Sequence, residues 1–215
     1  MEKRLGIAWP LTNEYVHSKF VLSWTLMEKP SSFSFFLPEF PGRIDAIRNS
    51  LVEQALKSYC THLLMMDTDQ TYPVDTITKL MSHDKPIVTA KVHRRYPPFD
   101  PILYRGSLHK FESVPDEEWK NNSLVRVDAT GAGCVLFDLS VFENIEYPWF
   151  EETIEKCEDG RNVVGEDVGF YIKAGQAGYE IFADVSIKMG HLSILEITEE
   201  TYFLFKKLSG HKIGS

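Results

Sequence analysis

The sequence lacks the features of several protein classes. It has three cysteines in 215 residues, Cys60, Cys134 and Cys157, and no CxxC pair. An odd count without paired spacing argues against a disulfide framework, so we expect reduced thiols in a cytoplasmic protein. No apolar run approaches the ~20 residues of a membrane span. Pro10 interrupts the N-terminal apolar stretch before it reaches the length of a signal peptide.

The chain also lacks an excess of positive charge. It carries 23 Lys and Arg against 31 Asp and Glu, a net charge of −8, and no long basic block. Nucleic acid is therefore not expected as the main partner. The other proportions, 43% apolar and 25% charged, are typical of a soluble globular protein. The length predicts one domain over residues 1–215, since no repeat, low-complexity tract or linker divides it.

Residues 1–92 alternate between strand and helix patterns. Short apolar runs predict strands, and apolar residues at helical spacing predict amphipathic helices. The expected strands are residues 4–9, 33–37, 63–66 and 86–92, and the expected helices are residues 17–27, 44–59 and a segment beginning at Pro73. This alternation predicts a parallel sheet covered by helices, in which ligands gather at the C-terminal strand ends.

The pattern changes after residue 92. Short antiparallel strands with polar loops between them are expected at residues 102–104, 108–111 and 124–128. A buried strand at Cys134–Asp138 and a short helix at 139–144 precede an expected loop at 146–164. A helix at 166–175, a strand at 180–183 and a final helix at 194–208 complete the prediction. The apolar stripe of the final helix includes Leu195, Tyr202, Phe205 and Leu208.

Two carboxylates, Asp67 and Asp69, end the strand predicted at residues 63–66. Because side chains alternate along a strand, both are expected to point the same way from its C-terminal end. Carboxylates this close repel each other unless a cation lies between them, and hard oxygen ligands suit Mg²⁺ or Mn²⁺. The alternative is a polar loop in which one Asp caps the helix near Pro73.

Three further segments contain candidate functional groups. Glu166 and Asp167 follow Gly165 at an expected helix start, where the helix dipole stabilises negative charge. They are either ordinary residues of a first helical turn or include a general base on a cleft floor. His191 is either structural or a ligand for a Mn²⁺-type ion. Small residues at 130–133 form a tight turn or let a ligand approach the backbone.

In this order, the segments resemble the GT-A glycosyltransferases, specifically the compact family-2-type enzymes that use nucleotide sugars. The resemblance covers nearly the whole chain. It rests on the Pro10 loop, Arg48-Asn49, Asp67-Thr68-Asp69, the Gly131-Ala132-Gly133 entry to Cys134, Gly165-Glu166-Asp167 and Gly190-His191. It implies an α/β fold of GT-A type. A Rossmann-like nucleotide-binding half (1–92) would contain a mixed, mostly parallel central sheet with helices on both faces. An acceptor-binding half (93–215) would add a small antiparallel region.

The resemblance implies roles for the candidate residues. Asp69 would bind the Mn²⁺ or Mg²⁺ that bridges the donor's diphosphate, with Asp67 near the ribose or the metal's waters and His191 as a further ligand. Pro10, Thr12, Arg48 and Glu39 would line the nucleotide pocket. Ala132 and Gly133 would lie under the sugar or acceptor. Asp167 would take the proton of the acceptor hydroxyl, with Glu166 as its neighbour or substitute.

The implied reaction is transfer of a sugar from a UDP- or GDP-sugar to a hydroxyl of a saccharide, protein or small molecule. A base on the face opposite the leaving group gives inversion. A carboxylate at a helix N-terminus is expected to have a lowered pKa, so position would matter more than basicity. The chain has no Gln-x-x-Arg-Trp motif, which favours single sugar transfer over polysaccharide synthesis. Loops at 93–101, including Arg94 and Arg95, and at 146–164 are expected to contact the acceptor or form a lid.

Two alternatives remain open at this point. Asp67-Thr68-Asp69-Gln70-Thr71 also fits the motif of haloacid-dehalogenase-like phosphatases, in which Asp67 would be the nucleophile. That motif normally follows the first strand, whereas two strand-helix units precede it here. The other alternative is a non-catalytic nucleotide-sugar-binding protein of the same fold, because fold alone does not fix function.

Overall fold

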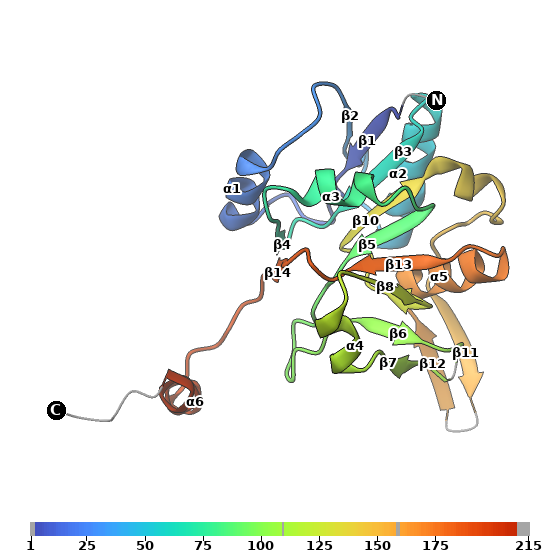
Figure 1. Cartoon of the computed structure of the whole chain (residues 1–215). Helices are drawn as coiled ribbons and strands as arrows, with labels where there is room; N and C mark the ends of the chain where they lie inside the picture. Colours follow the sequence, from blue (N-terminus) through green and yellow to red (C-terminus); the bar gives the residue numbers. More distant parts are fainter. Residues whose placement is uncertain (1–2, 109, 158–159, 210–215) are drawn as a thin grey trace.

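A seven-stranded sheet forms the centre of the molecule in a computed structural model of the chain (Figure 1). The structure describes residues 3–108, 110–157 and 160–209, without the side chains of residues 155–162 and 209. The sheet has the strand order β2-β1-β3-β10-β5-β13-β8. Its strands are β1 (Leu5–Ala8), β2 (Ser34–Phe36), β3 (His62–Met66), β5 (Ile87–Ala90), β8 (Leu124–Val127), β10 (Cys134–Asp138) and β13 (Ile181–Asp184).

The sheet is mixed. β2, β1, β3, β5 and β13 run in one direction, whereas β10 and β8 run in the other. The predicted mixed, mostly parallel α/β sheet is therefore confirmed. The strand-helix alternation of residues 1–92 could not show that an antiparallel strand from later in the chain, β10, separates β3 from β5. The boundary at residue 92 stays a prediction.

Helices cover both faces of the sheet, and the side chains of β3 alternate between the two cores that result. Leu63 and Met65 join one core with α2 and α5, and Leu64 and Met66 join the other with α1 and α3. The helices are α1 (Ser18–Leu26), α2 (Ile44–Lys57), α3 (Thr76–Ser82), α4 (Asp116–Asn121), η1 (Leu139–Glu143), a 3-10 helix, α5 (Glu166–Gln176) and α6 (Glu199–Ser209). Since both faces of β3 are covered, all five of its residues are buried.

Three small sheets surround the central one. They are formed by β4 (Gln70–Thr71) with β14 (Gly190–His191), by β6 (Leu103–Arg105) with β7 (Glu112–Ser113) and β9 (Ala129–Thr130), and by β11 (Thr153–Cys157) with β12 (Gly160–Val164). The last pair contradicts the loop predicted at 146–164, because half of that segment is a hairpin. The side chain of Cys157 lies outside the described residues, whereas Cys60 and Cys134 are free thiols.

Other predicted boundaries are wrong in particular places. The helix expected from Pro73 begins at Thr76, since Asp75 is its N-cap residue. The strand expected at 108–111 lies at Glu112–Ser113, with residue 109 outside the description. α4 was not predicted, because it is short and buries no side chain. The final helix begins at Glu199 instead of residue 194, so Leu195 is not part of its stripe.

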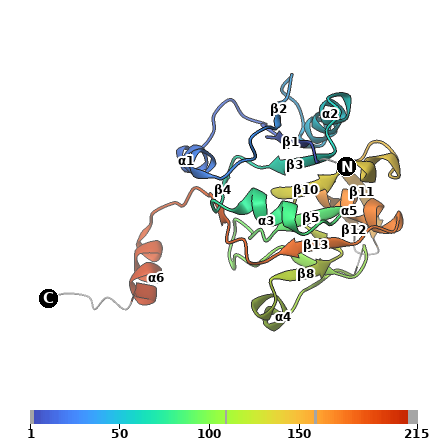
Figure 2. The ribbon, with the colours of Figure 1, turned by 45° about the horizontal axis from the view of Figure 1, so that its top comes forward.

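α6 stands apart from the rest of the chain. In Figures 1 and 2 it lies at the end of an extended segment that leaves the domain at β14. Its apolar side chains are exposed instead of packed on the sheet. Among the described residues, no helix is long and apolar enough to cross a membrane.

Candidate active site

The acidic pair lies in a turn that follows β3. The strand ends at Met66, so Asp67 and Asp69 do not both extend from a strand, and the expected alternation does not orient them. The Asp67 backbone N–H donates to the Gly133 carbonyl at 2.9 Å. The Tyr72 hydroxyl reaches the carbonyls of Asp67 at 2.6 Å and Gly133 at 2.9 Å. These bonds fix the turn against the entry to β10.

Gly133 leaves room for the Gln70 side chain at this contact. A Cβ atom placed on it would lie 1.9 Å from Nε2 of Gln70, whose side chain is 1% exposed. Because real Cβ atoms do not approach other atoms so closely, any side chain at position 133 would force the buried Gln70 side chain to move, which glycine avoids.

The pairing of two short strands, β14 and β4, brings His191 to the acidic turn. β14 pairs with β4, so that His191 is opposite Gln70, and the Leu192 N–H donates to the Asp69 carbonyl at 2.7 Å. A Cβ atom on Gly190 would lie 2.6 Å from Thr71 Oγ1, so glycine also permits this approach. Residues 122 positions apart along the chain, Asp69 and His191, are therefore held side by side.

The His191 ring is oriented by a backbone carbonyl. Its Nδ1 lies 2.6 Å from the His93 carbonyl oxygen, to which it must donate, and its Nε2 lies 3.6 Å from Asp69 Oδ2. Arg95 Nη1 lies 3.0 Å from the same oxygen. Although burial opposes ionisation, the bond with His191 and the charges of His191 and Arg95 hold the pKa of Asp69 below its usual range.

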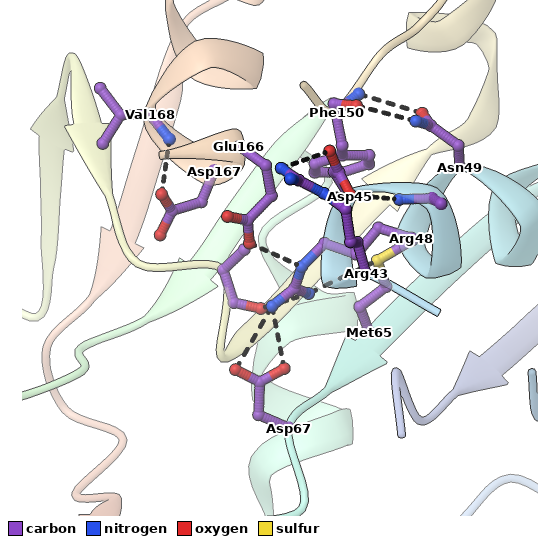
Figure 3. A network of polar contacts seen from close by, with 12 residues as sticks. Arg43, Asp45, Arg48, Asn49, Met65, Asp67, Phe150, Glu166, Asp167 and Val168 are labelled. Atoms are coloured by element: carbon purple, nitrogen blue, oxygen red, sulfur yellow. Dashed lines mark hydrogen bonds and ion pairs between the residues drawn. The ribbon is translucent and has the colours of Figure 1, made fainter. Parts of the chain in front are cut away.

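Arg48 joins the acidic turn to the start of α5 (Figure 3). Its guanidinium lies 3.0 Å from Asp67 Oδ1 and 3.3 Å from Glu166 Oε1, and it donates to the Ala132 carbonyl at 3.3 Å. The side chain is 4% exposed. Burial alone would lower the pKa of Arg48, but the charges of Asp67 and Glu166 raise it, so the group is a permanent buried cation.

Replacing Arg48 with methionine is expected to lower the free energy of unfolding by about 3 kcal/mol, because Asp67 and Glu166 lose their buried partner. Urea denaturation at pH 7 would measure this. Arg43→Met is the matched control, since Arg43 pairs with Asp45 and Glu152 while 67% exposed. That control is expected to cost less than about 1 kcal/mol. Equal losses in the two variants would show that Arg48 has no special structural role.

Asp167 is the second residue of α5 and accepts a hydrogen bond from the Val168 N–H at 2.7 Å. The expectation of a lowered pKa is wrong. Burial, followed by the charge of Glu166, raises the pKa of Asp167 to about 6, and the helix N–H and Arg48 only partly oppose this. At this position the loss of water around the carboxylate outweighs the favourable N–H groups of the helix N-terminus. A pKa near 6 suits a general base at neutral pH.

Comparison with known proteins agrees with this architecture. The Anp1 family, a glycosyltransferase family, matches residues 43–104, which include Arg48, Asp67 and Asp69. The chain is similar to A197 from STIV, with 14% identity, 89% of this chain and 86% of that chain covered, and a TM-score of 0.61. It is also similar to Drosophila β1,4-galactosyltransferase 7 in complex with manganese, UDP-Gal and xylobiose, with 12% identity, 94% and 79% coverage, and a TM-score of 0.52. The protein has the GT-A fold.

A third similar structure is TarS from S. aureus in complex with UDP-GlcNAc, with 14% identity, 96% of this chain and 65% of that chain covered, and a TM-score of 0.48. No curated protein sequence matches the chain significantly. The similarity to β1,4-galactosyltransferase 7 described above confirms the predicted resemblance to GT-A glycosyltransferases at the level of the fold.

The GT-A fold gathers almost all of the predicted site residues around one cleft of about 540 Å³. Its lining from the first half of the chain includes Pro10, Thr12, Arg48, Asp67 and Asp69. Its lining from the second half includes Ala132, Gly133, Glu166, Asp167 and His191. Glu39 does not line this cleft but a neighbouring hollow of about 250 Å³ that shares Thr12 with it. A cavity of about 530 Å³ around His62 and Asp138, at the other end of the sheet, contains none of the predicted residues.

The cleft of this GT-A fold has the chemistry of a divalent-cation site. Asp69 Oδ1 is buried and has no hydrogen-bond partner, which is costly unless a ligand satisfies it. His191 donates through Nδ1, so its Nε2 can bind a metal as a neutral ring, the usual arrangement of a metal-ligating histidine. No group of three or more His, Cys, Asp or Glu that could hold a metal occurs in the described part of the chain. Mg²⁺-type ions nevertheless need only one or two protein ligands when substrate phosphates supply the others.

Charge in the cleft also favours a bound cation. Three arginines and four carboxylates line it, so the carboxylates outnumber the arginines by one before His191 is counted. The four carboxylates would repel the phosphates of a nucleoside diphosphate, and a cation that entered with it would reduce this repulsion. The residues present therefore fit a divalent ion.

Two residues near the acidic turn were not predicted: Tyr72, which anchors the turn to Gly133, and Gln70, which pairs with His191. Nothing in their spacing relates them to these partners. Arg94 and Arg95 were both predicted to lie in a loop that contacts the acceptor or forms a lid. The structure places Arg95 in the cleft, in contact with Asp69, whereas Arg94 bonds the Tyr104 hydroxyl at 2.6 Å. The Pro- and Arg-containing composition of loop 93–101 was the only signal for this contact.

Proposed function

We propose that the protein is a metal-dependent glycosyltransferase that moves a sugar from a nucleoside diphosphate sugar to an acceptor hydroxyl. One observation carries the proposal: in a GT-A fold, a half-buried carboxyl with a pKa of about 6 shares a cleft with an Asp–His pair that suits a divalent cation. The Anp1 match and the nucleotide-sugar complex named above support the same class of donor.

Asp69 and His191 would hold the cation, with Asp67 close to its waters or to the donor ribose. Pro10 and Thr12 would line the nucleotide pocket. When bound, a divalent cation neutralises the charge that develops on the diphosphate leaving group. Ala132 and Gly133 would present their backbone under the sugar, since Gly133 has no side chain to exclude it.

Arg48 would support the nucleotide pocket from beneath. It would not be free to bind the nucleotide sugar itself. It is buried, and it contacts Asp67, Glu166 and the Ala132 carbonyl at the same time. It therefore fixes the distance between the acidic turn and the first turn of α5. Glu39, from the neighbouring hollow, would contact the donor only at its periphery.

Asp167 would remove the proton of the acceptor hydroxyl. The hydroxyl oxygen then forms a bond to the anomeric carbon, and the bond from that carbon to the diphosphate oxygen breaks with its electron pair leaving on the phosphate. Inversion follows when the base and the leaving group lie on opposite faces of the sugar. The raised pKa makes Asp167 a stronger base than an exposed carboxylate and leaves it largely ionised at neutral pH.

A nucleoside diphosphate and Mn²⁺ together are expected to raise the melting temperature by about 5–10 °C at a ligand concentration of 100 Kd, because both bind only the folded chain. Differential scanning fluorimetry with UDP, GDP and their sugars, each with and without Mn²⁺, would measure this and identify the base. Uridine and guanosine monophosphates are the matched controls, since they lack the second phosphate. A shift with phosphate analogues and Mg²⁺ but no nucleotide would favour the phosphatase alternative, and no shift at all would contradict the proposal.

A further inference from the structure

Arg95 occupies the carboxylate that is proposed to bind the cation. Its Nη1 lies 3.0 Å from Asp69 Oδ2, the same oxygen that His191 Nε2 approaches at 3.6 Å. A divalent cation shared by Asp69 and His191 would therefore meet a guanidinium at the carboxylate oxygen that faces the histidine. Like charges at such distances repel each other, so Arg95 and the cation compete for Asp69.

Arg95 differs from the other two arginines that line the cleft. Arg48 is buried and contacts two carboxylates and a carbonyl, and Arg43 pairs with two carboxylates that do not line the cleft. The Arg95 side chain is 46% exposed, and its one ion pair among the described residues is with Asp69. That contact uses one nitrogen of a guanidinium that carries five N–H donors. Arg95 is therefore the arginine of the cleft that can turn toward a ligand.

The loop that carries Arg95 is fixed at its base. The His93 carbonyl accepts a hydrogen bond from His191 Nδ1 at 2.6 Å, and the Arg94 N–H donates to the Asp100 carbonyl at 2.9 Å. These bonds hold the backbone next to Arg95 against the rest of the site. Arg95 can therefore exchange one partner for another by rotation of its side chain.

A nucleoside diphosphate is the anion that suits this guanidinium. Its phosphates present adjacent oxygens, which the planar fork of an arginine binds through parallel N–H donors. Asp69 and His191 line the same cleft, beside Arg95, and a cation held there could contact the same phosphates. One diphosphate can thus meet both positive groups, which removes their competition.

We propose that Arg95 is a ligand of the donor's diphosphate and that, without the nucleotide, it occupies Asp69 in place of the cation. This inference rests on the proposed function. Arg95 turns from Asp69 to the phosphates when the nucleotide enters, and Asp69 Oδ2 then becomes available to the cation. Cation and nucleotide consequently bind as a pair, and each strengthens the binding of the other by the same factor.

Replacing Arg95 with glutamine is expected to change two affinities in opposite directions. Mn²⁺ alone is expected to bind about fivefold more tightly than it binds the wild type, because no guanidinium competes for Asp69. UDP or GDP, titrated at saturating Mn²⁺, is expected to bind about tenfold more weakly, because a charge-assisted hydrogen bond to phosphate is lost. Electron paramagnetic resonance of free Mn²⁺ measures the first affinity, and calorimetric titration measures the second.

Arg94→Gln is the matched control. Arg94 lies in the same loop and carries the same charge, but it bonds the Tyr104 hydroxyl at 2.6 Å, and neither residue lines the cleft. Both affinities of this variant are expected to stay within about twofold of the wild type. Arg95→Gln is expected to keep the wild-type melting temperature within about 2 °C, because an exposed ion pair contributes little to folding.

The outcomes separate this inference from the proposed function. Tighter binding of Mn²⁺ and weaker binding of nucleotide by Arg95→Gln, but not by Arg94→Gln, would support the inference. If Arg95→Gln matched Arg94→Gln in either affinity, or bound both Mn²⁺ and nucleotide more weakly, the inference would be overturned while the proposed function stood. A wild type that bound neither UDP nor GDP in the presence of Mn²⁺ would overturn both.

Discussion

Replacing Asp167 with asparagine is expected to lower kcat by about 10²–10⁴-fold while donor binding is retained, because the variant loses the proton acceptor but keeps its size. Release of the nucleoside diphosphate from the donor that gives a melting shift would measure kcat. Calorimetric titration of the same donor would measure binding. In the wild type, kcat/KM is expected to fall about tenfold per pH unit below pH 6, where the carboxyl, with its pKa of about 6, becomes protonated.

The stability of this variant separates lost chemistry from lost structure. The folded-state pKa of Asp167 is raised from 3.8 to about 6, so ionising this carboxyl opposes folding. The penalty is absent below pH about 4, grows as the pH rises toward 6 and is complete above it. Asparagine does not ionise and keeps an oxygen for the Val168 N–H. The variant is therefore expected to be about 1–3 kcal/mol more stable than the wild type at pH 8.

Asp116→Asn is the matched control for Asp167→Asn. Asp116 also lies in the first turn of a helix, but it is exposed and pairs with Lys120 away from the cleft. Its replacement is expected to change kcat less than twofold, the change of a surface substitution. If Asp167→Asn kept more than a tenth of the wild-type kcat, Asp167 would not be the base, and Glu166 would be tested next.

Replacing Asp69 with alanine is expected to weaken Mn²⁺-dependent donor binding on the order of 100-fold. Loss of a residue that only supports a metal ligand already lowers metal affinity by about 10–100-fold, and Asp69 is proposed as a ligand itself. Calorimetric titration of donor with and without Mn²⁺ would measure the loss. Arg95 and His191 lose a contact in this variant, but both remain partly exposed to water, so the fold is expected to persist.

Asp75→Asn provides the control for the acidic turn. Asp75 pairs with Lys79 at 3.0 Å outside the cleft, and its loss changes the net charge as the loss of Asp69 does. Donor binding by this variant is expected to match the wild type. If Asp69→Ala bound the donor as well as Asp75→Asn does, Asp69 would not be a ligand of the cation.

Local patterns predicted the parts of the fold that depend on local contacts. β10 was predicted with its observed bounds, because a short apolar run between a turn of small residues and a polar segment indicates a buried strand. α2 was predicted because Ile47, Leu51 and Ala55 recur at helical spacing and all are buried. The hairpin β11–β12 was missed because its segment offers no continuous alternation of apolar and polar residues, and the two strands stabilise each other across the turn.

The candidate site was predictable as a set of residues and not as a network. Ten predicted residues line one cleft because the strand ends of a sheet meet at one edge. Nothing in the sequence shows that Arg48 spans Asp67 and Glu166, since this depends on how α2 and α5 share one face of the sheet. Nor does the sequence show that burial raises the pKa of Asp167 more than the helix N-terminus lowers it. The predicted role of Glu39 at the nucleotide stays a prediction, because the loop after β2 borders a neighbouring hollow that shares Thr12 with the cleft.

The central position of β10 has a consequence for synthesis on the ribosome. β3 and β5 leave the ribosome before β10. Neither strand can pair along the edge that faces β10 until residues 134–138 follow. Until then both strands present unpaired edges, which are templates for association with other chains. The Gly133 carbonyl that receives the Asp67 N–H immediately precedes β10. Insertion of β10 between β3 and β5 and anchoring of the acidic turn at Asp67 are therefore one event, whereas Asp167 and His191 follow later in the chain.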